Sequence, residues 1–138
     1  MQQVTDAIDT ILARTRRIAI VGLSDRPDRA SHEVATALQA RGYAIIPVNP
    51  GIESALGIPA VDSLADIEGP VDLVDVFRRA EHLPGVAREA AAIGAPALWN
   101  QLGLSSDEAR RIAEDAGMDY VEDRCLKVEV LGRGARPA

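Results

Sequence analysis

Three segments of the chain share one pattern, in which an apolar helix ends at a glycine and an apolar strand follows at once. They read ARGYAIIPV, AIGAPALW and DAGMDYV, and their glycines are Gly42, Gly94 and Gly117. Glycine readily takes the left-handed conformation that ends a helix. Helices that alternate with short apolar strands predict a mainly parallel sheet with right-handed crossovers.

The other apolar segments extend this pattern to a Rossmann-like, doubly wound α/β fold with helices on both faces of a mainly parallel sheet. We expect five or six strands, at residues 18–21, 44–48, 71–77, 97–99 and 119–121, with a short edge strand at 58–61.

Polar residues and a proline mark the starts of the expected helices. Ser31 is a candidate N-cap for a helix over 31–41, and the segment SSDE offers a capping box from Ser105 to Glu108. Pro84 fits the first turn of the helix after the third strand. The segment SLADI predicts one or two further helical turns.

The first residues of the chain, 1–13, predict an amphipathic helix. Val4, Ile8, Ile11 and Leu12 fall on one face of it, so this helix is expected to cover an edge of the domain.

The length and composition predict a single domain over residues 1–138. The chain has 138 residues, of which 47% are hydrophobic, enough to build a core. The last segment, GRGARPA at 132–138, is expected to be a frayed tail.

Charge and cysteine content exclude several classes of partner. The formal net charge of −6 argues against nucleic acid, which usually requires a basic face. No run of 18 apolar residues is present, so no membrane-spanning segment is expected. The alternative that the N-terminal helix lies on a membrane surface is opposed by Asp6 and Asp9, because such helices use a basic polar face. The single cysteine, Cys125, allows no disulfide framework or cysteine metal cluster and suits a reducing compartment. We therefore expect a soluble cytoplasmic protein.

The segment after the first strand, VGLSDRPDRASHEVA, is a candidate phosphate-binding loop. A glycine at the end of a strand followed by a helix start presents free backbone N–H groups and the helix dipole to an anion. Gly22 alone is weak evidence, because a full dinucleotide fingerprint reads G-x-G-x-x-G. Arg26 and Arg29 can add positive charge, but the alternative that Asp25 and Asp28 merely neutralise them stays open at this point.

The end of the second strand argues against NAD. Dinucleotide-binding folds usually place an acidic residue there, which binds the ribose hydroxyls. This chain reads PVNP, so Asn49 occupies that place.

Catalytic candidates are few. His32 and His82 lie near expected helix starts, where each has an alternative as a cap or surface residue, and Cys125 follows the last strand beside Arg124. A single cysteine is more often a small buried apolar residue than a reactive thiol.

Taken together, the segments VGLSDRPDRASHEVA, GYAIIPVNP, VDLVDVFRRAEHLP, ALWNQLG and DRCLKVE resemble the small stand-alone coenzyme A-binding proteins of bacteria and archaea. The resemblance covers residues 14–131. That family is similar to the N-terminal CoA-binding domain of succinyl-CoA synthetase α-chains, which implies a nucleotide-binding Rossmann fold with strand order 3-2-1-4-5-6.

The resemblance also implies the residues that contact the ligand. These are Gly22, Leu23 and Ser24 at the pyrophosphate, Arg29 and Ser31 beside it, Asn49 and Pro50 near the nucleotide, Val76, Phe77 and Arg78 along the ligand, and Asn100 and Gln101 after the next strand.

The expected function is therefore binding of coenzyme A or an acyl-CoA without catalysis, because the second synthetase domain and its phosphorylated histidine have no counterpart here. One alternative is a small NAD(P)-linked or CoA-dependent enzyme that uses His82 or Cys125. Another is a protein-interaction module with a vestigial crevice, docked through its N-terminal helix.

Overall fold

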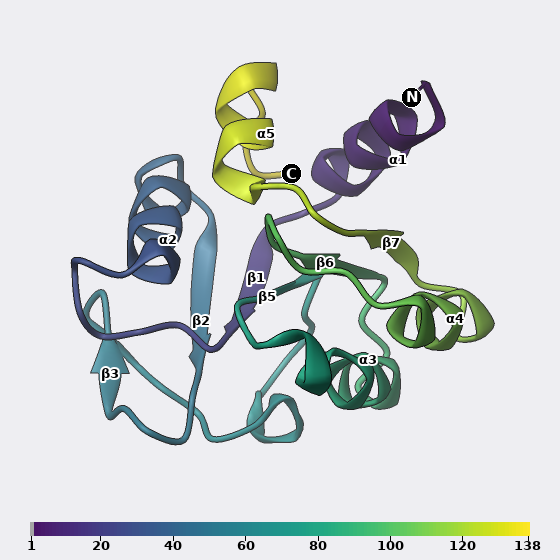
Figure 1. Ribbon diagram of the computed structural model, residues 1–138. Coiled ribbons are helices and arrows are strands. Elements are labelled where there is room, and N and C mark those ends of the chain that lie inside the picture. Colours follow the sequence, from purple (N-terminus) through teal and green to yellow (C-terminus); the bar gives the residue numbers. More distant parts are fainter. Residues whose placement is uncertain (1) are drawn as a thin grey trace.

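A computed structural model describes residues 2–138, so residue 1 of the expected N-terminal helix lies outside the described residues. Figure 1 shows strands and helices alternating along most of the chain. Their bounds are α1 Gln2–Ala13, β1 Arg17–Val21, α2 Ala30–Ala40, β2 Ala44–Val48, β3 Ser54–Ala55, β4 Ile58–Pro59, the 3₁₀ helix η1 Leu64–Asp66, β5 Leu73–Val76, the 3₁₀ helix η2 Ala80–His82, α3 Leu83–Ala92, β6 Ala97–Asn100, α4 Asp107–Asp115, β7 Asp119–Val121 and α5 Leu126–Arg133.

Within these residues the main sheet has five strands in the order β2-β1-β5-β6-β7, and all four neighbouring pairs are parallel. From β1 the chain moves outward to β2 and then returns to β5 on the other side of β1. The direction of strand order thus reverses between β1 and β5. This confirms the predicted Rossmann-like fold and locates its switch point.

Helices cover both faces of the sheet (Figure 1). Side chains of α1, α2 and α5 pack on one face around Ile20 and Trp99. Side chains of η1, α3 and α4 pack on the other face around Val74 and Leu98. Because successive strand residues point to opposite faces, Leu73 belongs to the first cluster and Val74 to the second.

The expected edge strand at 58–61 differs in the structure. Residues 54–59 form a separate antiparallel hairpin, closed by Leu56 and Gly57, which both have positive φ as a tight two-residue turn requires. Only Val61 reaches the main sheet, through an isolated bridge to Val48. The implied order 3-2-1-4-5-6 therefore lacks its outermost strand in the described residues.

Two of the expected helix starts were wrong by one or two positions. Arg29 is the N-cap of α2, and Ser31 lies inside the helix with a buried side chain. Ser106, rather than Ser105, caps α4, where its hydroxyl accepts a hydrogen bond from the backbone N–H of Ala109 at 3.1 Å. In both cases the serine hydroxyl accepts a hydrogen bond from a backbone N–H: that of Ala109, inside the helix, for Ser106, and that of Ser24, in the preceding loop, for Ser31.

Other local predictions were confirmed. Gly42, Gly94 and Gly117 have positive φ just after their helices, and Pro84 lies in the first turn of α3. The SLADI segment contains η1, which carries a capping box between Ser63 and Asp66.

The chain ends pack against the rest of the fold. In α1, Ile8, Ile11 and Leu12 are buried, as the pattern predicted, whereas Val4 on the same face is 37% exposed. The segment 132–138, expected to be frayed, includes the end of α5 and makes hydrogen bonds in the structure. Arg41 donates to the carbonyl oxygen of Ala135 at 3.0 Å, and the N–H of Ala138 donates to that of Thr15 at 2.9 Å. Among residues 2–138, no helix is long and apolar enough to cross a bilayer.

Candidate functional site

The turn at Gly22 lies at the switch point between β1 and β5. Its N–H donates to the carbonyl oxygen of Val48 at 2.8 Å, and the N–H of Phe77 donates to that of Val21 at 2.8 Å. Gly22 has a φ of 86°, and a Cβ atom at this position would overlap the carbonyl oxygen of Phe77. Glycine therefore permits the loops that follow β1 and β5 to touch.

A buried serine fixes the loop after this turn. Ser31 is 6% exposed, and its Oγ accepts a hydrogen bond from the backbone N–H of Ser24 at 3.0 Å. The hydroxyl of Ser24 in turn accepts from the N–H of Arg26 at 3.1 Å. The loop thus takes its shape from the helix that it leads into.

The N-terminus of α2 is open to a ligand. No side chain caps this 11-residue helix, so the backbone N–H groups of its first turn keep their capacity for an anion. Arg26 pairs with Asp28 at 3.3 Å, whereas Arg29 has no ion-pair partner in residues 2–138. The charge of Arg29 is therefore not cancelled by a neighbouring carboxylate.

A cavity of about 350 Å³ lies at this helix end, and we call it the glycine-loop cavity. It is lined by Gly22, Ser24, Arg26, Arg29, Ala30, Ser31 and Phe77.

Glu33, in the first turn of α2, would by itself repel an anion. Its carboxylate forms an ion pair with Nζ of Lys127, on α5, at 2.8 Å. The hydrogen bond and charge of Lys127 lower the pKa of Glu33, and Glu33 in turn raises the pKa of Lys127. The negative charge near the helix end is thus offset by a lysine from another helix.

Asn49 joins the loop after β2 to the glycine turn. Its Nδ2 donates to the carbonyl oxygen of Leu23 at 3.0 Å, and its Oδ1 accepts from the N–H of Gly51 at 2.8 Å. Both ends of the amide therefore bind backbone groups, while the neighbouring Pro50 is exposed.

A second cavity, of about 480 Å³, adjoins the first, and we call it the apolar cavity. Its lining consists of Ala30 and Val34 from α2, Phe77, Arg78 and Arg79 after β5, Gln101, Leu102 and Leu104 after β6, and Cys125 after β7. It shares Ala30 and Phe77 with the glycine-loop cavity. The two cavities are therefore neighbours at the carboxyl edge of the sheet, and we call them together the candidate site.

Residues 16–130 match the family described as CoA binding domain. The chain belongs to the CoA-binding domain family. It is 54% identical over 121 residues to YneT of Bacillus subtilis (strain 168), described as an uncharacterized protein. This match covers 88% of this chain and 90% of YneT.

Two solved structures share the fold of this chain. A protein from Thermus thermophilus, cell-free ID.343, is 34% identical to this chain and superposes with a TM-score of 0.87. This match covers 93% of this chain and 97% of the Thermus chain. A dinucleotide-forming acetyl-coenzyme A synthetase of Ca. Korarchaeum cryptofilum has the same fold in one part, at a TM-score of 0.68 and 20% identity. That match covers 78% of this chain and 25% of the synthetase chain.

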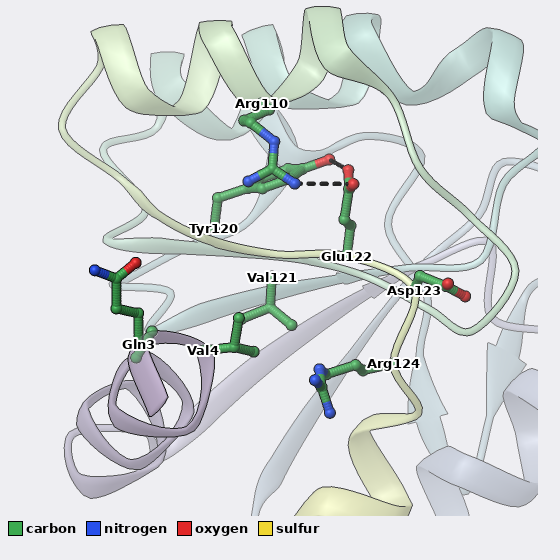
Figure 2. A pocket seen from close by; sticks show the side chains of 9 residues that line it. Gln3, Val4, Arg110, Tyr120, Val121, Glu122, Asp123 and Arg124 are labelled. Carbon is green, nitrogen blue, oxygen red and sulfur yellow. Dashed lines mark hydrogen bonds and ion pairs between the residues drawn. The ribbon is translucent and has the colours of Figure 1, made fainter. Parts of the chain in front are cut away.

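In this CoA-binding domain, Asn100 lies away from both cavities. It is 1% exposed, and its Nδ2 donates to the Tyr120 hydroxyl at 2.8 Å. Figure 2 shows the continuation of this network, in which Arg110 reaches across the Tyr120 ring toward Glu122. The Tyr120 hydroxyl donates to Glu122 at 2.8 Å, and Arg110 pairs with Glu122 at 2.9 Å.

These contacts shift two pKa values in opposite directions. Burial and the hydrogen bond to Glu122 raise the pKa of Tyr120. Burial opposes the ionisation of Glu122, but hydrogen bonds from Tyr120, the Ser106 N–H and Arg110 lower its pKa. The cavity of about 450 Å³ beside them, between α1 and β7, is thus lined by charges that already have partners (Figure 2).

The expected ligand residues of the CoA-binding domain therefore separate into three groups. Gly22, Ser24, Arg29, Ser31, Phe77, Arg78 and Gln101 line one or both cavities of the site. Asn49 and Pro50 form the adjoining turn. Leu23, Val76 and Asn100 are buried in the core.

Sequence reasoning missed most of the apolar wall: Ala30, Val34, Leu102 and Leu104. Leu102 is the one of these residues that the sequence could have indicated as part of a binding surface, and in the structure it is 69% exposed. A leucine between a glutamine and a glycine just beyond a strand belongs to no core pattern.

Proposed function

We propose that this protein binds coenzyme A or an acyl-CoA through its phosphates at the glycine-loop cavity, and that it acts by binding rather than by catalysis. The observation that carries this proposal is the uncapped N-terminus of α2, which lies beside the unpaired Arg29 at the switch point of a CoA-binding domain. Backbone N–H groups and an arginine together suit a pyrophosphate.

Arg78 supports the same proposal from the opposite side of the turn. Its Cδ would lie 3.3 Å from a Cβ atom on Gly22, so its stem packs against the glycine turn. Arg78 has no ion-pair partner among residues 2–138. Arg29 lines the glycine-loop cavity and Arg78 lines the neighbouring apolar cavity, and neither arginine has a carboxylate that neutralises it.

Asn49 makes NAD a poor alternative. An NAD site usually requires a carboxylate at this position to bind the ribose hydroxyls. Here both ends of the Asn49 side chain bind backbone groups of the neighbouring loops. A ribose that competed for them would disturb the glycine turn.

Thermal unfolding in the presence of CoA, NAD or pantetheine tests the proposal. At a concentration of 100 times its Kd, a ligand selective for the folded state adds about 2.7 kcal/mol, which raises Tm by about 5–10 °C for a domain of this size. We expect this rise with CoA and much smaller rises with equal concentrations of NAD or pantetheine, which has no nucleotide phosphates. A larger rise with NAD, or an equal rise with pantetheine, would contradict phosphate-directed CoA binding.

A further inference from the structure

Apolar side chains form much of the wall of the apolar cavity, and such a wall is not suited to the charged phosphates of CoA. We infer that it holds the acyl group of an acyl-CoA with an uncharged chain, and that the Gln101 side-chain amide donates a hydrogen bond to the thioester carbonyl. This inference rests on the proposed function, since it places the acyl end of the same ligand.

The position of the cavity fits this role. Ala30 and Phe77 line both cavities, so the apolar cavity lies next to the place at the end of α2 where the phosphates are proposed to bind. The volume of about 480 Å³ lies within the range that small-molecule sites use.

The wall is suited to a chain of methylenes. Val34, Phe77, Leu102 and Leu104 present apolar side chains from α2 and from the loops after β5 and β6. Leu102 is 69% exposed and gains burial if an acyl chain packs beside it. The exposed leucine is then part of a binding surface rather than an unexplained loss of apolar burial.

The arginines of this cavity do not call for a charged acyl group. Arg79 is largely exposed and pairs with Glu81 at 3.4 Å. Arg78 lines the apolar cavity, but its Cδ lies against the glycine turn, and we assign its charge to the phosphates proposed to bind there. A terminal carboxylate on the acyl chain would therefore be placed among apolar side chains, which costs free energy.

Gln101 is the uncharged amide side chain of this wall. It is 4% exposed, and its Oε1 accepts a hydrogen bond from the backbone N–H of Leu126 at 3.0 Å. Because a backbone N–H can only donate, this contact fixes Oε1 toward Leu126 and leaves Nε2 as the free donor. No group within residues 2–138 accepts a hydrogen bond from Nε2. A carbonyl oxygen in the cavity would supply the missing acceptor.

Isothermal titration with five ligands tests the inference: CoA, butanoyl-CoA, hexanoyl-CoA, succinyl-CoA and S-hexyl-CoA, which has no thioester carbonyl. Each methylene that enters the cavity should increase affinity about fourfold. We expect hexanoyl-CoA to bind at least tenfold tighter than CoA, with butanoyl-CoA between them. Hexanoyl-CoA should also bind about two- to tenfold tighter than S-hexyl-CoA, the range for one hydrogen bond.

Two variants separate the chain from the carbonyl. Leu102→Asp places a charge in the cavity wall at an exposed position, so it should abolish the gain of hexanoyl-CoA over CoA, each measured on the same variant. Its matched control is Val128→Asp on α5, at 61% exposure and outside the cavity, which should keep the gain. Gln101→Glu retains an acceptor for Leu126 but removes the donor, so the ratio between hexanoyl-CoA and S-hexyl-CoA should fall to about one.

The outcomes distinguish this inference from the proposed function. Equal affinity for CoA and hexanoyl-CoA, or tighter binding of succinyl-CoA than of hexanoyl-CoA, would overturn the acyl cavity while CoA binding stands. A hexanoyl preference that survives Leu102→Asp would overturn it as well. If none of the five ligands binds, the proposed function itself is wrong.

Discussion

The Oγ of Ser31, in the first turn of α2, accepts a hydrogen bond from the backbone N–H of Ser24, 3.0 Å away across the glycine loop. A side chain inside the helix thus shapes the loop that precedes it. Ser24 then has no free N–H for a ligand, so the anion capacity of this region lies in the helix end and in Arg29.

Ser31→Ala should reduce both stability and CoA affinity, because it removes the acceptor that holds the loop. Leaving a partly buried donor without a partner costs about 1 kcal/mol, at the low end of the usual range. Chemical denaturation and calorimetric titration measure the two effects.

Ser106→Ala is the matched control for Ser31→Ala. Ser106 also accepts a hydrogen bond from a backbone N–H, but it caps α4 and lines neither cavity of the site. It should cost about 1 kcal/mol of stability and leave CoA affinity unchanged. Equal affinities for the two variants would show that Ser31 has no part in shaping the site.

Arg29→Ala should weaken CoA binding strongly. A charge-assisted hydrogen bond to phosphate contributes about 1.5–3 kcal/mol, which corresponds to a roughly 10- to 150-fold loss of affinity. Arg111→Ala, at an exposed position of α4, removes the same charge elsewhere and should leave binding unchanged. An Arg29→Ala affinity equal to that of Arg111→Ala would exclude Arg29 from the phosphate site.

Asp75 gives an expected pH dependence of stability. It is fully buried between Ile20 and Trp99 in the central strands, and neither carboxylate oxygen has a hydrogen-bond partner of normal geometry in the described residues. Burial raises the pKa of Asp75 well above its ordinary value. The folded protein thus keeps a proton that the unfolded chain releases above about pH 4.

The sign follows from this difference. The stability that the protonated Asp75 permits is fully present below the unfolded-state pKa and is lost as the pH rises toward the folded-state pKa, by up to about 1.4 kcal/mol per pH unit. The Asp75→Asn side chain cannot ionise. The unfolding free energy of this variant minus that of the parent should therefore increase from pH 5 to pH 8. Urea denaturation across this range measures the difference.

Asp115→Asn, on the exposed surface of α4, controls for the change in net charge. If the parent and Asp75→Asn lose stability in parallel as the pH rises, the buried carboxyl is not the group responsible.

Cys125→Ser should bind CoA within about a factor of three of the parent, roughly 0.6 kcal/mol. Cys125 is half-buried and forms part of the apolar cavity wall, and we expect its role there to be packing. Titration under reducing and oxidising conditions checks this. An increase in intact mass by one CoA, reversed by reductant and absent from the serine variant, would instead make the thiol a functional group.

The sequence also predicted the edge of the sheet at which the candidate site lies, because the carboxyl ends of parallel strands meet at one edge. Gly22, Phe77 and Gln101 follow three different strands, yet all three line the site there. The sequence did not show that Gln101 lines the candidate site whereas Asn100 does not. Strand β6 runs one residue further than expected, which turns Asn100 toward Tyr120 and leaves Gln101 at the cavity. Because successive residues of an extended strand point to opposite faces, Asn100 and Gln101 face different sides of the sheet.

What the sequence by itself determined is the alternation of helices and strands, since the apolar periods and the glycines at helix ends are local properties of the chain. Only the tertiary structure decided that Ser31 holds a loop instead of capping a helix, that Lys127 offsets Glu33, and that the last residues pack on Thr15 and Arg41. Each of these is a contact between segments that local pattern does not relate. Such contacts form only after the packing of the sheet and helices has brought the two partners together.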